Sequence, residues 1–435
     1  MKSVSDVVFC IVDHGLFAVP WAQRLAKEAK HVYLHTPWEE GFSTINKAII
    51  GDGFSGIERC NDIWKIKNKV DCFVMPDIQH SGLQLELESQ GFPVWGARAG
   101  DSQELDRELF LKTLKRVGLE VPEHEVVTGL PALRETLREK EDCYIKISFY
   151  RGSLETTHFR SWHLDKELLD LWGLRFGPAG DHIRFLVFEN IDTPLEIGGD
   201  TYCIDGQWPS LMLHGVEWKD EAYFASVSKR EEMPEQLQEV MEAFGPVLGE
   251  KRYRSQWSME CRVEIEGGKR SFFIDPTCRG GLPSTGSQLE LWKNWPEIVW
   301  AGAHGELVDP EPAAKFSAES ILTIKGDKTQ WGVTEIPPEL EQWIKLSNAC
   351  EIEGRTCFPP DDSGSHAIGW LVAIGDTPEE TIKKMNEQAD LLLSGLNANT
   401  ECLAYVLQEI HTAEEQGIEF SKQETPPPEI VLEST

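Results

Sequence analysis

The chain has 435 residues and a formal net charge of −31, from 73 acidic and 42 basic side chains. Such a surface repels phosphate backbones and anionic membranes, so the composition argues against direct binding of duplex nucleic acid. No apolar run approaches the roughly twenty residues that span a bilayer. The N-terminus also lacks the charged start and long apolar stretch of a signal peptide. We therefore expect a cytoplasmic protein that contacts no membrane.

The ten cysteines stand singly along the chain, without a CxxC pair. Several lie inside apolar, strand-like runs, where a reduced thiol behaves as a small hydrophobic group. The twelve histidines form no HxH or HExxH motif. The sequence therefore predicts buried, reduced thiols and no zinc site.

The first hundred residues alternate between strand and helix patterns. Short apolar runs predict buried strands over residues 6–12, 31–36, 70–75 and 92–96. Helical spacing predicts helices over residues 21–29 and 81–91. Because strands that alternate with helices are typical of a parallel, helix-covered sheet, we expect residues 1–100 to form an N-terminal parallel α/β domain. No GxGxxG follows the first strand, so a dinucleotide site is not predicted.

The central part of the chain, residues 101–310, predicts a larger α+β domain with two subdomains. Residues 102–118 predict one amphipathic helix that ends at glycine, and residues 130–140 predict a second helix. From about residue 184 the pattern changes to antiparallel strands, with turns at Asp205-Gly206 and Gly267-Gly268.

The C-terminal part predicts a small α+β domain over residues 311–417. It contains two strand segments, at residues 319–326 and 366–375, and a helix that begins near Thr377 with good N-terminal signals. Residues 418–435 include a triple proline and little apolar periodicity, which predicts a disordered tail. The expected fold class is therefore α/β and α+β, in three domains.

A lysine inside an apolar strand is the first chemical signal. Lys146 lies in the run YIKISF, where burial of its ammonium is costly unless an anion meets it. The turn that follows contains Arg151, Gly152 and Ser153, whose backbone N–H groups could lie near a phosphate. The alternative is a lysine at a strand edge that extends to water.

A second signal is the end of a later apolar strand. Glu189, Asn190 and Ile191 form that end, and Glu196 follows seven residues after Glu189. This arrangement suits a strand end whose backbone faces an adenine, with a carboxylate nearby for the ribose hydroxyls. The alternative is a pair of solvated acids.

The third signal is a pair of acids on two strands joined by a turn. Antiparallel pairing can bring Glu260 and Asp275 to one face. Paired carboxylates beside phosphates suit Mg²⁺, which prefers oxygen ligands. Arg279, which follows the second strand, could stabilise charge on a transferring phosphoryl group. The alternative is a polar hairpin face.

Taken in order, these motifs resemble the ATP-grasp superfamily, in which two α+β subdomains hold ATP between them. The resemblance implies a phosphate-binding and catalytic role for Lys146, and a catalytic role for Arg279. It implies ATP contacts at residues of the early helix, the turn and the strand end: Arg107, Lys146, Arg151, Gly152, Ser153, Glu189, Asn190, Ile191 and Glu196. It also implies that Mg²⁺ (or Mn²⁺) binds at Glu260, Asp275 and Thr277.

Within the superfamily, residues 1–390 are most similar to the phosphoribosylamine–glycine ligases. The segments RELFLKTLKRVGLEVPEHEVV and HAIGWLVAIGDTPEETIKKM carry this similarity. The resemblance implies an ADP-forming carbon–nitrogen ligase of purine biosynthesis. Such an enzyme activates a small carboxylate as an acyl phosphate, which an amine substrate then attacks to form an amide.

Several positions depart from the family pattern. Arg107 stands where a lysine is usual, Thr277 stands where an asparagine is usual, and the turn RGSLETT contains a single glycine. The segments that shape substrate recognition in the glycine ligases are also missing. Two alternatives therefore remain: a ligase with a different amine acceptor (a modified nucleotide, nucleobase or peptide), or an inactive binding protein derived from the fold.

Overall fold

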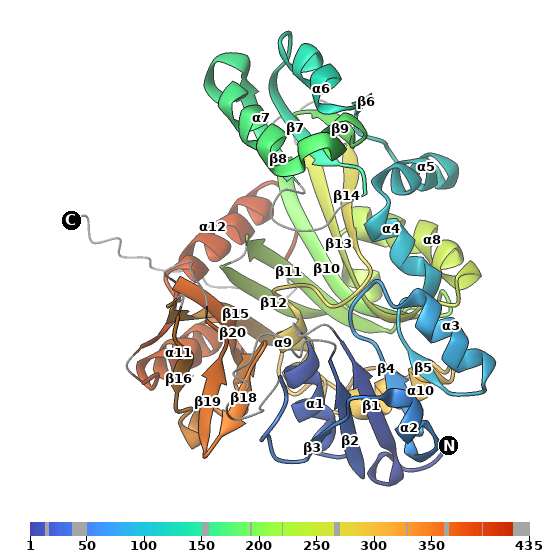
Figure 1. Ribbon diagram of the computed structural model, residues 1–435, viewed down its shortest axis with the longest axis vertical. Coiled ribbons are helices and arrows are strands. Elements are labelled where there is room, and N and C mark those ends of the chain that lie inside the picture. The colour runs from blue at the N-terminus through green and yellow to red at the C-terminus, as the bar shows by residue number, and fades with distance from the viewer. Residues whose placement is uncertain are drawn as a thin grey trace. The chain divides into compact units, whose positions relative to one another are not determined.

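The computed structural model describes residues 1–13, 17–36, 50–149, 156–191, 194–219, 221–264, 270–327, 329–360, 365–393 and 395–420 (Figure 1). Tertiary contacts divide the chain into two compact units. Unit 1 comprises Met1–Gly100, Ile197–Met259 and Thr277–Thr435, and unit 2 comprises Asp101–Glu196 and Glu260–Pro276. The three-domain division predicted from the sequence is a different partition and stays a prediction. Within the described ranges, no helix combines the length and apolar character needed to cross a membrane.

The N-terminal part of unit 1 contains a parallel sheet with strand order β3-β2-β1-β4-β5. Its strands are β1 (Val8–Val12), β2 (His31–His35), β3 (Ile57–Arg59), β4 (Cys72–Val74) and β5 (Val94–Trp95). The accompanying helices are α1 (Ala18–Ala26), α2 (Ile63–Ile66) and α3 (Ser81–Ser89). The parallel sheet predicted from the alternating pattern is confirmed. Since the strand order reverses direction between β1 and β4, the carboxyl ends of these two strands border a topological switch point.

A long antiparallel sheet follows, with strand order β14-β13-β10-β11-β12-β15-β20-β17 and with β21 paired to β15. Its strands are β10 (Pro194–Ile204), β11 (Leu211–Trp218), β12 (Ala222–Lys229), β13 (Arg254–Glu264), β14 (Ser271–Thr277), β15 (Phe316–Lys325), β17 (Ile344–Leu346), β20 (Ser365–Gly375) and β21 (Leu396–Ala398). Strands β10, β13 and β14 each have residues in both units. A small sheet is formed by β16 (Gly332–Thr334), β18 (Cys350–Ile352) and β19 (Arg355–Phe358).

The helices of unit 1 after the parallel sheet are α8 (Glu235–Glu250), α9 (Thr285–Leu291), α10 (Trp295–Ala303), α11 (Pro378–Asp390) and α12 (Cys402–Glu415). Large aromatic side chains join several of these elements in one core. Trp21 of α1, Trp95 of β5 and Trp295 of α10 are fully buried, and the Trp295 ring centroid lies 5.3 Å from that of Trp21 and 5.8 Å from that of Trp95. These tryptophans therefore serve packing.

Unit 2 contains a four-stranded antiparallel sheet with strand order β6-β9-β7-β8. Its strands are β6 (His124–Thr128), β7 (Glu141–Ile147), β8 (Thr156–Ser161) and β9 (Arg184–Glu189), and its helices are α4 (Ser102–Leu105), α5 (Arg107–Val117), α6 (Leu130–Leu137) and α7 (Trp162–Phe176). Leu133 of α6 and Trp172 of α7 pack with Ile145 and Val187 in one core. One face of this sheet is therefore covered by α6 and α7.

The single helix predicted over residues 102–118 is wrong in one respect, because the chain forms α4 and α5 there. Asp106 between them has an extended backbone, with φ −117° and ψ 94°, and its carboxylate accepts a hydrogen bond from the Leu109 N–H. Aspartate in this role satisfies a backbone donor that a helix start otherwise leaves unpaired. Asp106 is therefore the N-cap of a second helix, α5.

The start of the predicted tail also needs correction. Phe420 is 3% exposed, and its carbonyl accepts hydrogen bonds from Ser226 Oγ at 3.0 Å and His214 Nδ1 at 3.1 Å. Both partners lie on β11 and β12, so the chain remains packed two residues beyond Ile418. Residues 421–435 of the predicted tail lie outside the described residues.

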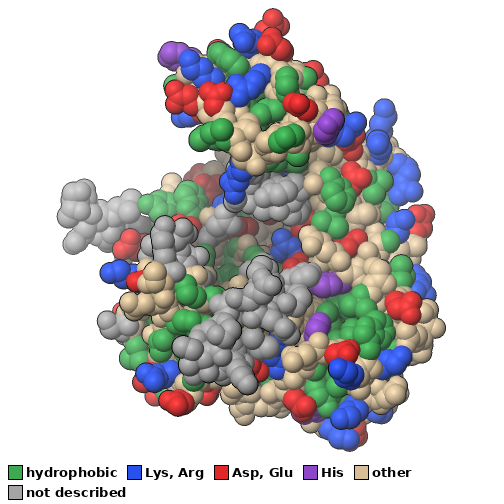
Figure 2. All heavy atoms as spheres, viewed as in Figure 1, with side chains coloured by type: hydrophobic (Ala, Val, Ile, Leu, Met, Phe, Trp, Pro, Cys, Tyr) green, Lys and Arg blue, Asp and Glu red, His purple; other side chains and the backbone are tan. Residues whose placement is uncertain are grey.

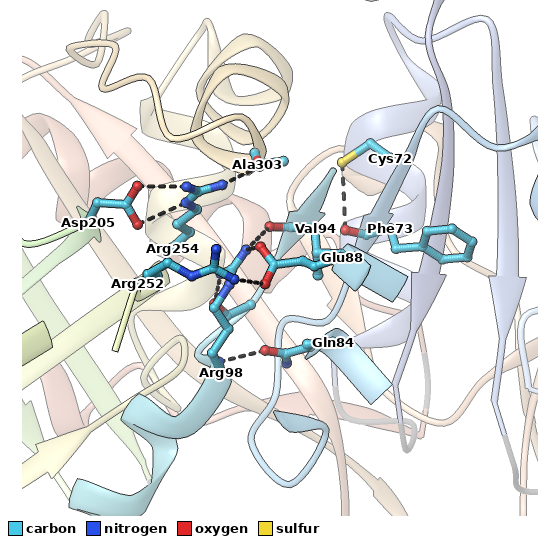
Figure 3. Close-up of polar contacts among 11 residues, drawn as sticks. Cys72, Phe73, Gln84, Glu88, Val94, Arg98, Asp205, Arg252, Arg254 and Ala303 are labelled. Carbon is cyan, nitrogen blue, oxygen red and sulfur yellow. Dashed lines mark hydrogen bonds and ion pairs between the residues drawn. The ribbon is translucent and has the colours of Figure 1, made fainter. Parts of the chain in front are cut away.

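A buried arginine joins the parallel sheet of unit 1 to the segment before β13 (Figure 3). The Arg98 guanidinium is fully buried and donates to the Gly96 carbonyl at 2.8 Å and the Val94 carbonyl at 2.7 Å. It also forms an ion pair of 2.8 Å with Glu88, whose second oxygen accepts from Arg252 at 2.5 Å. Since every bond replaces a lost water contact, this charge is tolerated inside the fold.

Replacing this arginine should destabilise unit 1. Arg98→Met leaves the Glu88 carboxylate and two carbonyls without their buried partner, and we expect it to lower the free energy of unfolding by about 3 kcal/mol. Arg252→Met is the matched control, because the Arg252 side chain is 57% exposed. It should cost under about 1 kcal/mol. Urea unfolding measures both losses of free energy. Equal losses would contradict the prediction that the buried Arg98 stabilises unit 1 more than the exposed Arg252.

Candidate functional site

The predicted phosphate-binding lysine lies on the face of the unit 2 sheet that α6 and α7 leave uncovered. Lys146 of β7 stands opposite Leu186 of β9 and Thr156 of β8, and Tyr144 stands opposite Phe188. Directly opposed residues of antiparallel strands point to the same face, so all five share it. The side chains of Lys146, Tyr144 and Phe188 are half-buried. This face therefore combines aromatic and apolar surface with one ammonium group.

Arg107 is held at the end of the strand that carries Lys146. It is 5% exposed, its guanidinium donates to the Ile147 carbonyl at 2.8 Å, and its backbone N–H donates to the Ser148 carbonyl at 3.1 Å. Arg107 thus lies beside the residue that follows Lys146. The turn that contains Arg151, Gly152 and Ser153 lies outside the described residues.

A network of charged and polar side chains connects the start of α5 to the strands of unit 2, and the sequence did not reveal it. Glu108 accepts two hydrogen bonds from the Arg184 guanidinium, at 2.6 and 2.7 Å, and one from Ser148 Oγ at 3.0 Å. Arg184, with Ser148, holds the pKa of Glu108 below its usual range, although partial burial opposes this shift. The network ties the start of α5 to β7 and β9, and therefore positions Arg107 and Lys146.

Glu196, whose carboxylate is predicted to bind ribose hydroxyls, lies near the sheet face that carries Lys146 and Tyr144. Glu196 forms an ion pair of 3.2 Å with Arg262 of β13, and the Arg262 guanidinium lies 5.8 Å from the centroid of the Tyr144 ring. Glu260 stands two residues before Arg262, so both project from the same side of β13. The structure therefore brings Glu196 and the first predicted metal ligand to the side of β13 that faces Tyr144.

Asp275 lies on β14, next to β13 in the sheet, and is half-buried like Glu260. Thr277 is two residues farther along β14 and projects from the same side. In the hairpin formed by β13 and β14, the Glu264 N–H donates to the Arg270 carbonyl at 2.9 Å. The turn predicted at Gly267-Gly268 lies outside the described residues.

The donor set suits magnesium better than a structural metal. Among the described residues, no group of three or more histidine, cysteine or acidic side chains could hold a metal ion. Mg²⁺ is commonly held by one or two carboxylates and takes the rest of its ligands from water and substrate phosphates. Two half-buried acids on neighbouring strands therefore fit a metal that arrives with a phosphate ligand.

Glu189, the first residue of the predicted strand end, does not share the sheet face of Lys146. Glu189 stands opposite Cys143, whose side chain belongs to the core beneath α6 and α7, so Glu189 lies on the sheet face opposite to Lys146. Its carboxylate is 3.9 Å from Lys140 Nζ, at a hollow of about 600 Å³. Asn190 Nδ2 donates to Asp142 at 2.8 Å, and the Ile191 side chain is half-buried. A ligand on the Lys146 face would therefore meet the backbone of this strand end.

The predicted catalytic arginine belongs to unit 1 and lies at the switch point of the parallel sheet. Arg279 Nε is 3.6 Å from a carboxylate oxygen of Asp77, which follows β4, and the guanidinium lies 5.9 Å from the Phe17 ring centroid at the start of α1. Crevices at such points bind ligands in many open α/β sheets. Asp77 was missed at the sequence level, although its position after a buried strand was a usable signal.

On the face shown in Figure 2, acidic and basic side chains are interspersed. The net charge of −31 is therefore not gathered into one acidic patch on this face.

Solved structures with low sequence identity share the fold. A phosphoribosylamine–glycine ligase from Thermotoga maritima matches with a TM-score of 0.64 at 16% identity, over 91% of this chain and 98% of that chain. The biotin carboxylase domain of Hydrogenobacter thermophilus 2-oxoglutarate carboxylase, in complex with MgADP, ADP and bicarbonate, matches at 0.64 and 11% identity, over 98% and 100%. An L-amino acid ligase from Bacillus licheniformis matches at 0.61 and 15% identity, over 92% and 99%.

No protein-family model matches the sequence, and no curated protein does so either. The structural likeness confirms the ATP-grasp fold predicted from the order of the motifs, including its mixture of a parallel sheet and antiparallel sheets. The roles of the individual site residues stay predictions.

The Glu108 network allows a test that needs no ligand. Glu108→Gln removes charge-assisted hydrogen bonds, and we expect a loss of about 1.5 kcal/mol in the free energy of unfolding at pH 7. Because the folded state lowers the pKa of Glu108, its contribution is present above the ordinary glutamate pKa. The difference from wild type should therefore shrink as the pH falls through the lowered pKa.

The control is Asp170→Asn, which breaks the exposed ion pair of 2.7 Å between Arg134 and Asp170. It should change the stability by less than about 0.5 kcal/mol. Chemical unfolding at several pH values measures both variants. A Glu108→Gln variant with wild-type stability would contradict the role given to this network.

Proposed function

We propose that the chain is an ATP-dependent carboxylate–amine ligase that forms an amide through an acyl phosphate. The observation that carries this proposal is the placement of Lys146 on the unit 2 sheet face that α6 and α7 do not cover, with Glu196 and Glu260 on the side of β13 that faces Tyr144. The fold supports it, because solved structures that share the fold include two amide-forming ligases by name and one complex with MgADP.

In the proposed reaction, an oxygen of the carboxylate substrate attacks the γ-phosphorus of ATP. The bond between that phosphorus and the β–γ bridging oxygen breaks, and ADP leaves. The amine then attacks the acyl carbon, phosphate leaves, and the nitrogen loses a proton as the amide forms. Such transfers depend mainly on the positioning of the reactants and on the neutralisation of charge.

The residues of the chain have distinct proposed tasks. Lys146 and Arg107 bind phosphate oxygens, and the Arg107 side chain is already oriented by the Ile147 carbonyl. Glu196 accepts from ribose hydroxyls, and the backbone of Asn190 and Ile191 meets the adenine. When bound, Mg²⁺ neutralises phosphate charge, and Glu260, Asp275 and Thr277 would hold it. Arg279 stabilises negative charge on the transferring phosphoryl group.

The identity of the amine is a finer question. The expected substrates are glycine and phosphoribosylamine, as in the glycine ligases that the sequence resembles. The absent recognition segments favour another acceptor, and an L-amino acid ligase shares the fold. ADP release with a panel of amino acids, each with phosphoribosylamine or a second amino acid as acceptor, distinguishes these alternatives. A purified protein that binds ATP and releases no ADP with any pair would support the non-catalytic alternative.

Nucleotide binding tests the core of the proposal. We expect ATP to bind in the presence of Mg²⁺ and to bind at least tenfold more weakly to Lys146→Met, a loss of about 1.4 kcal/mol. Lys140→Met is the matched control, because Lys140 is a lysine of the same unit that lies near Glu125 and Glu189. It should bind ATP like wild type. Calorimetric titration with and without Mg²⁺ measures these affinities, and equal binding by both variants would refute the assigned phosphate site.

Catalysis and binding can be separated at Arg279. Arg279→Met should leave the affinity for MgATP within about threefold of wild type and lower kcat for ADP release by about 10²–10³, the effect of removing one transition-state donor. A coupled assay of ADP release measures kcat and KM. A variant that loses affinity but keeps kcat would assign Arg279 to ground-state binding instead.

A further inference from the structure

A group of buried acids and hydroxyls lies on the large sheet of unit 1, beneath the loop that carries Arg279. Asp200 of β10 is 6% exposed, and Glu319 of β15 is fully buried. The loop from Thr277 to Ser284 leads into α9, and its last residue contacts both acids. Neither acid has a task in the proposed reaction, so their burial needs another explanation.

Asp200 collects hydroxyl donors from three different elements. Tyr223 Oη of β12 donates to one carboxylate oxygen at 2.6 Å. Ser284 Oγ donates to the other oxygen at 2.7 Å, and Ser258 Oγ of β13 donates to that same oxygen. One bond therefore comes from the loop and two come from the sheet, which makes Asp200 the link between them.

A glycine makes this arrangement possible. Gly215 of β11 lies between β10 and β12, opposite Gly198 and Ala225. A Cβ atom at Gly215 would overlap the Tyr223 hydroxyl. The missing side chain therefore lets the Tyr223 ring cross β11 and reach Asp200.

Glu319 holds the same loop through the backbone. Its Oε1 accepts from the Ser284 N–H at 3.1 Å and from the Ser287 N–H at 2.6 Å, in the first turn of α9. Ser284 has φ +106°, a conformation that an L-residue adopts at a cost. A side-chain bond to Asp200 and a backbone bond to Glu319 therefore hold a strained residue at the end of the loop.

We propose that Asp200 and Glu319 are positioning residues that hold the loop Thr277–Ser284, and with it Arg279, in the geometry that catalysis needs. The proposal rests on the proposed function for the role of Arg279. The positioning itself depends only on contacts within unit 1. The two acids lie on different strands of one sheet, β10 and β15, and both bond to Ser284, so this loop is their common partner.

The electrostatics of the pair adds a pH dependence. Burial, with a smaller contribution from the charge of Asp200, raises the pKa of Glu319 to about 7, although hydrogen bonds from Ser287 and from the Ser284 N–H oppose the rise. Asp200 and Tyr223 are titratable groups that interact electrostatically with Glu319. Since the folded-state pKa lies above the ordinary value, a rise in pH favours any state in which Glu319 reaches water. The loop should therefore open more readily as the pH rises through about 7.

Hydrogen exchange of the full chain, followed by mass spectrometry, tests the positioning directly. In Ser284→Ala we expect the backbone amides of residues 279–288 to exchange about tenfold faster than in wild type, the change produced by the loss of one buried hydrogen bond. Ser258→Ala is the matched control, since it removes a hydroxyl bond to the same Asp200 oxygen from a strand instead of the loop. It should leave exchange of residues 279–288 within about twofold of wild type.

Glu319→Gln tests the pH dependence with the smallest change in shape. After correction for intrinsic exchange rates, wild-type residues 279–288 should exchange faster at pH 8 than at pH 6. The Glu319→Gln variant should lose this difference, because its amide does not ionise. Equal pH dependence in both proteins would overturn the role of Glu319.

Activity and exchange separate the two proposals. If the chain is a ligase, Ser284→Ala should lower kcat for ADP release and leave KM for ATP within about twofold, because the phosphate-binding residues of unit 2 are untouched. Absence of ADP release by wild type would refute the proposed function, while the exchange data would still decide the positioning. Equal exchange in Ser284→Ala and Ser258→Ala would refute the positioning, whatever the activity.

Discussion

The need to satisfy one buried carboxylate constrains much of unit 1. Removing Asp200 from water costs several kcal/mol unless hydrogen bonds replace the lost hydration. Its three hydroxyl donors come from β12, β13 and the loop before α9. Each donor element must therefore stay in register with β10, and Gly215 must remain without a side chain for Tyr223 to pass. The hydrogen bonds to Asp200 therefore constrain the spacing of the strands, the glycine at position 215 and the conformation of the loop before α9.

Unit 2 follows a different rule, in which one face of a sheet is packed by helices and the other carries residues of the candidate site. The packed face buries Ile145 and Val187 beneath α6 and α7. The opposite face carries Lys146, Tyr144 and Phe188, which are half-buried. The alternation of side chains along β7 and β9 separates these two tasks, so the core and the candidate site are built from the same strands.

Several residues of the candidate site were predicted from the sequence because their signals are local, and their roles stay predictions. A lysine in an apolar strand, two acids flanking a turn and an arginine just after it are each readable within a few residues. The order of these motifs predicted the ATP-grasp fold, which the solved structures confirm. The support for the site was not accessible, because Glu108 and Arg184 are 76 residues apart. The partnership of Arg279 with Asp77 likewise joins distant parts of the chain.

The sequence by itself determined most strands and helices of residues 1–100, since the period of apolar residues sets the side-chain face that each element buries. It did not place the break before α5, because a helix N-cap depends on a side-chain contact at one residue, Asp106. Only the tertiary structure decided that Glu189 lies on the face opposite to Lys146, and that Ser284 joins Asp200 to Glu319. Side-chain direction and long-range pairing follow from strand register, and register is set by the packing of the whole sheet.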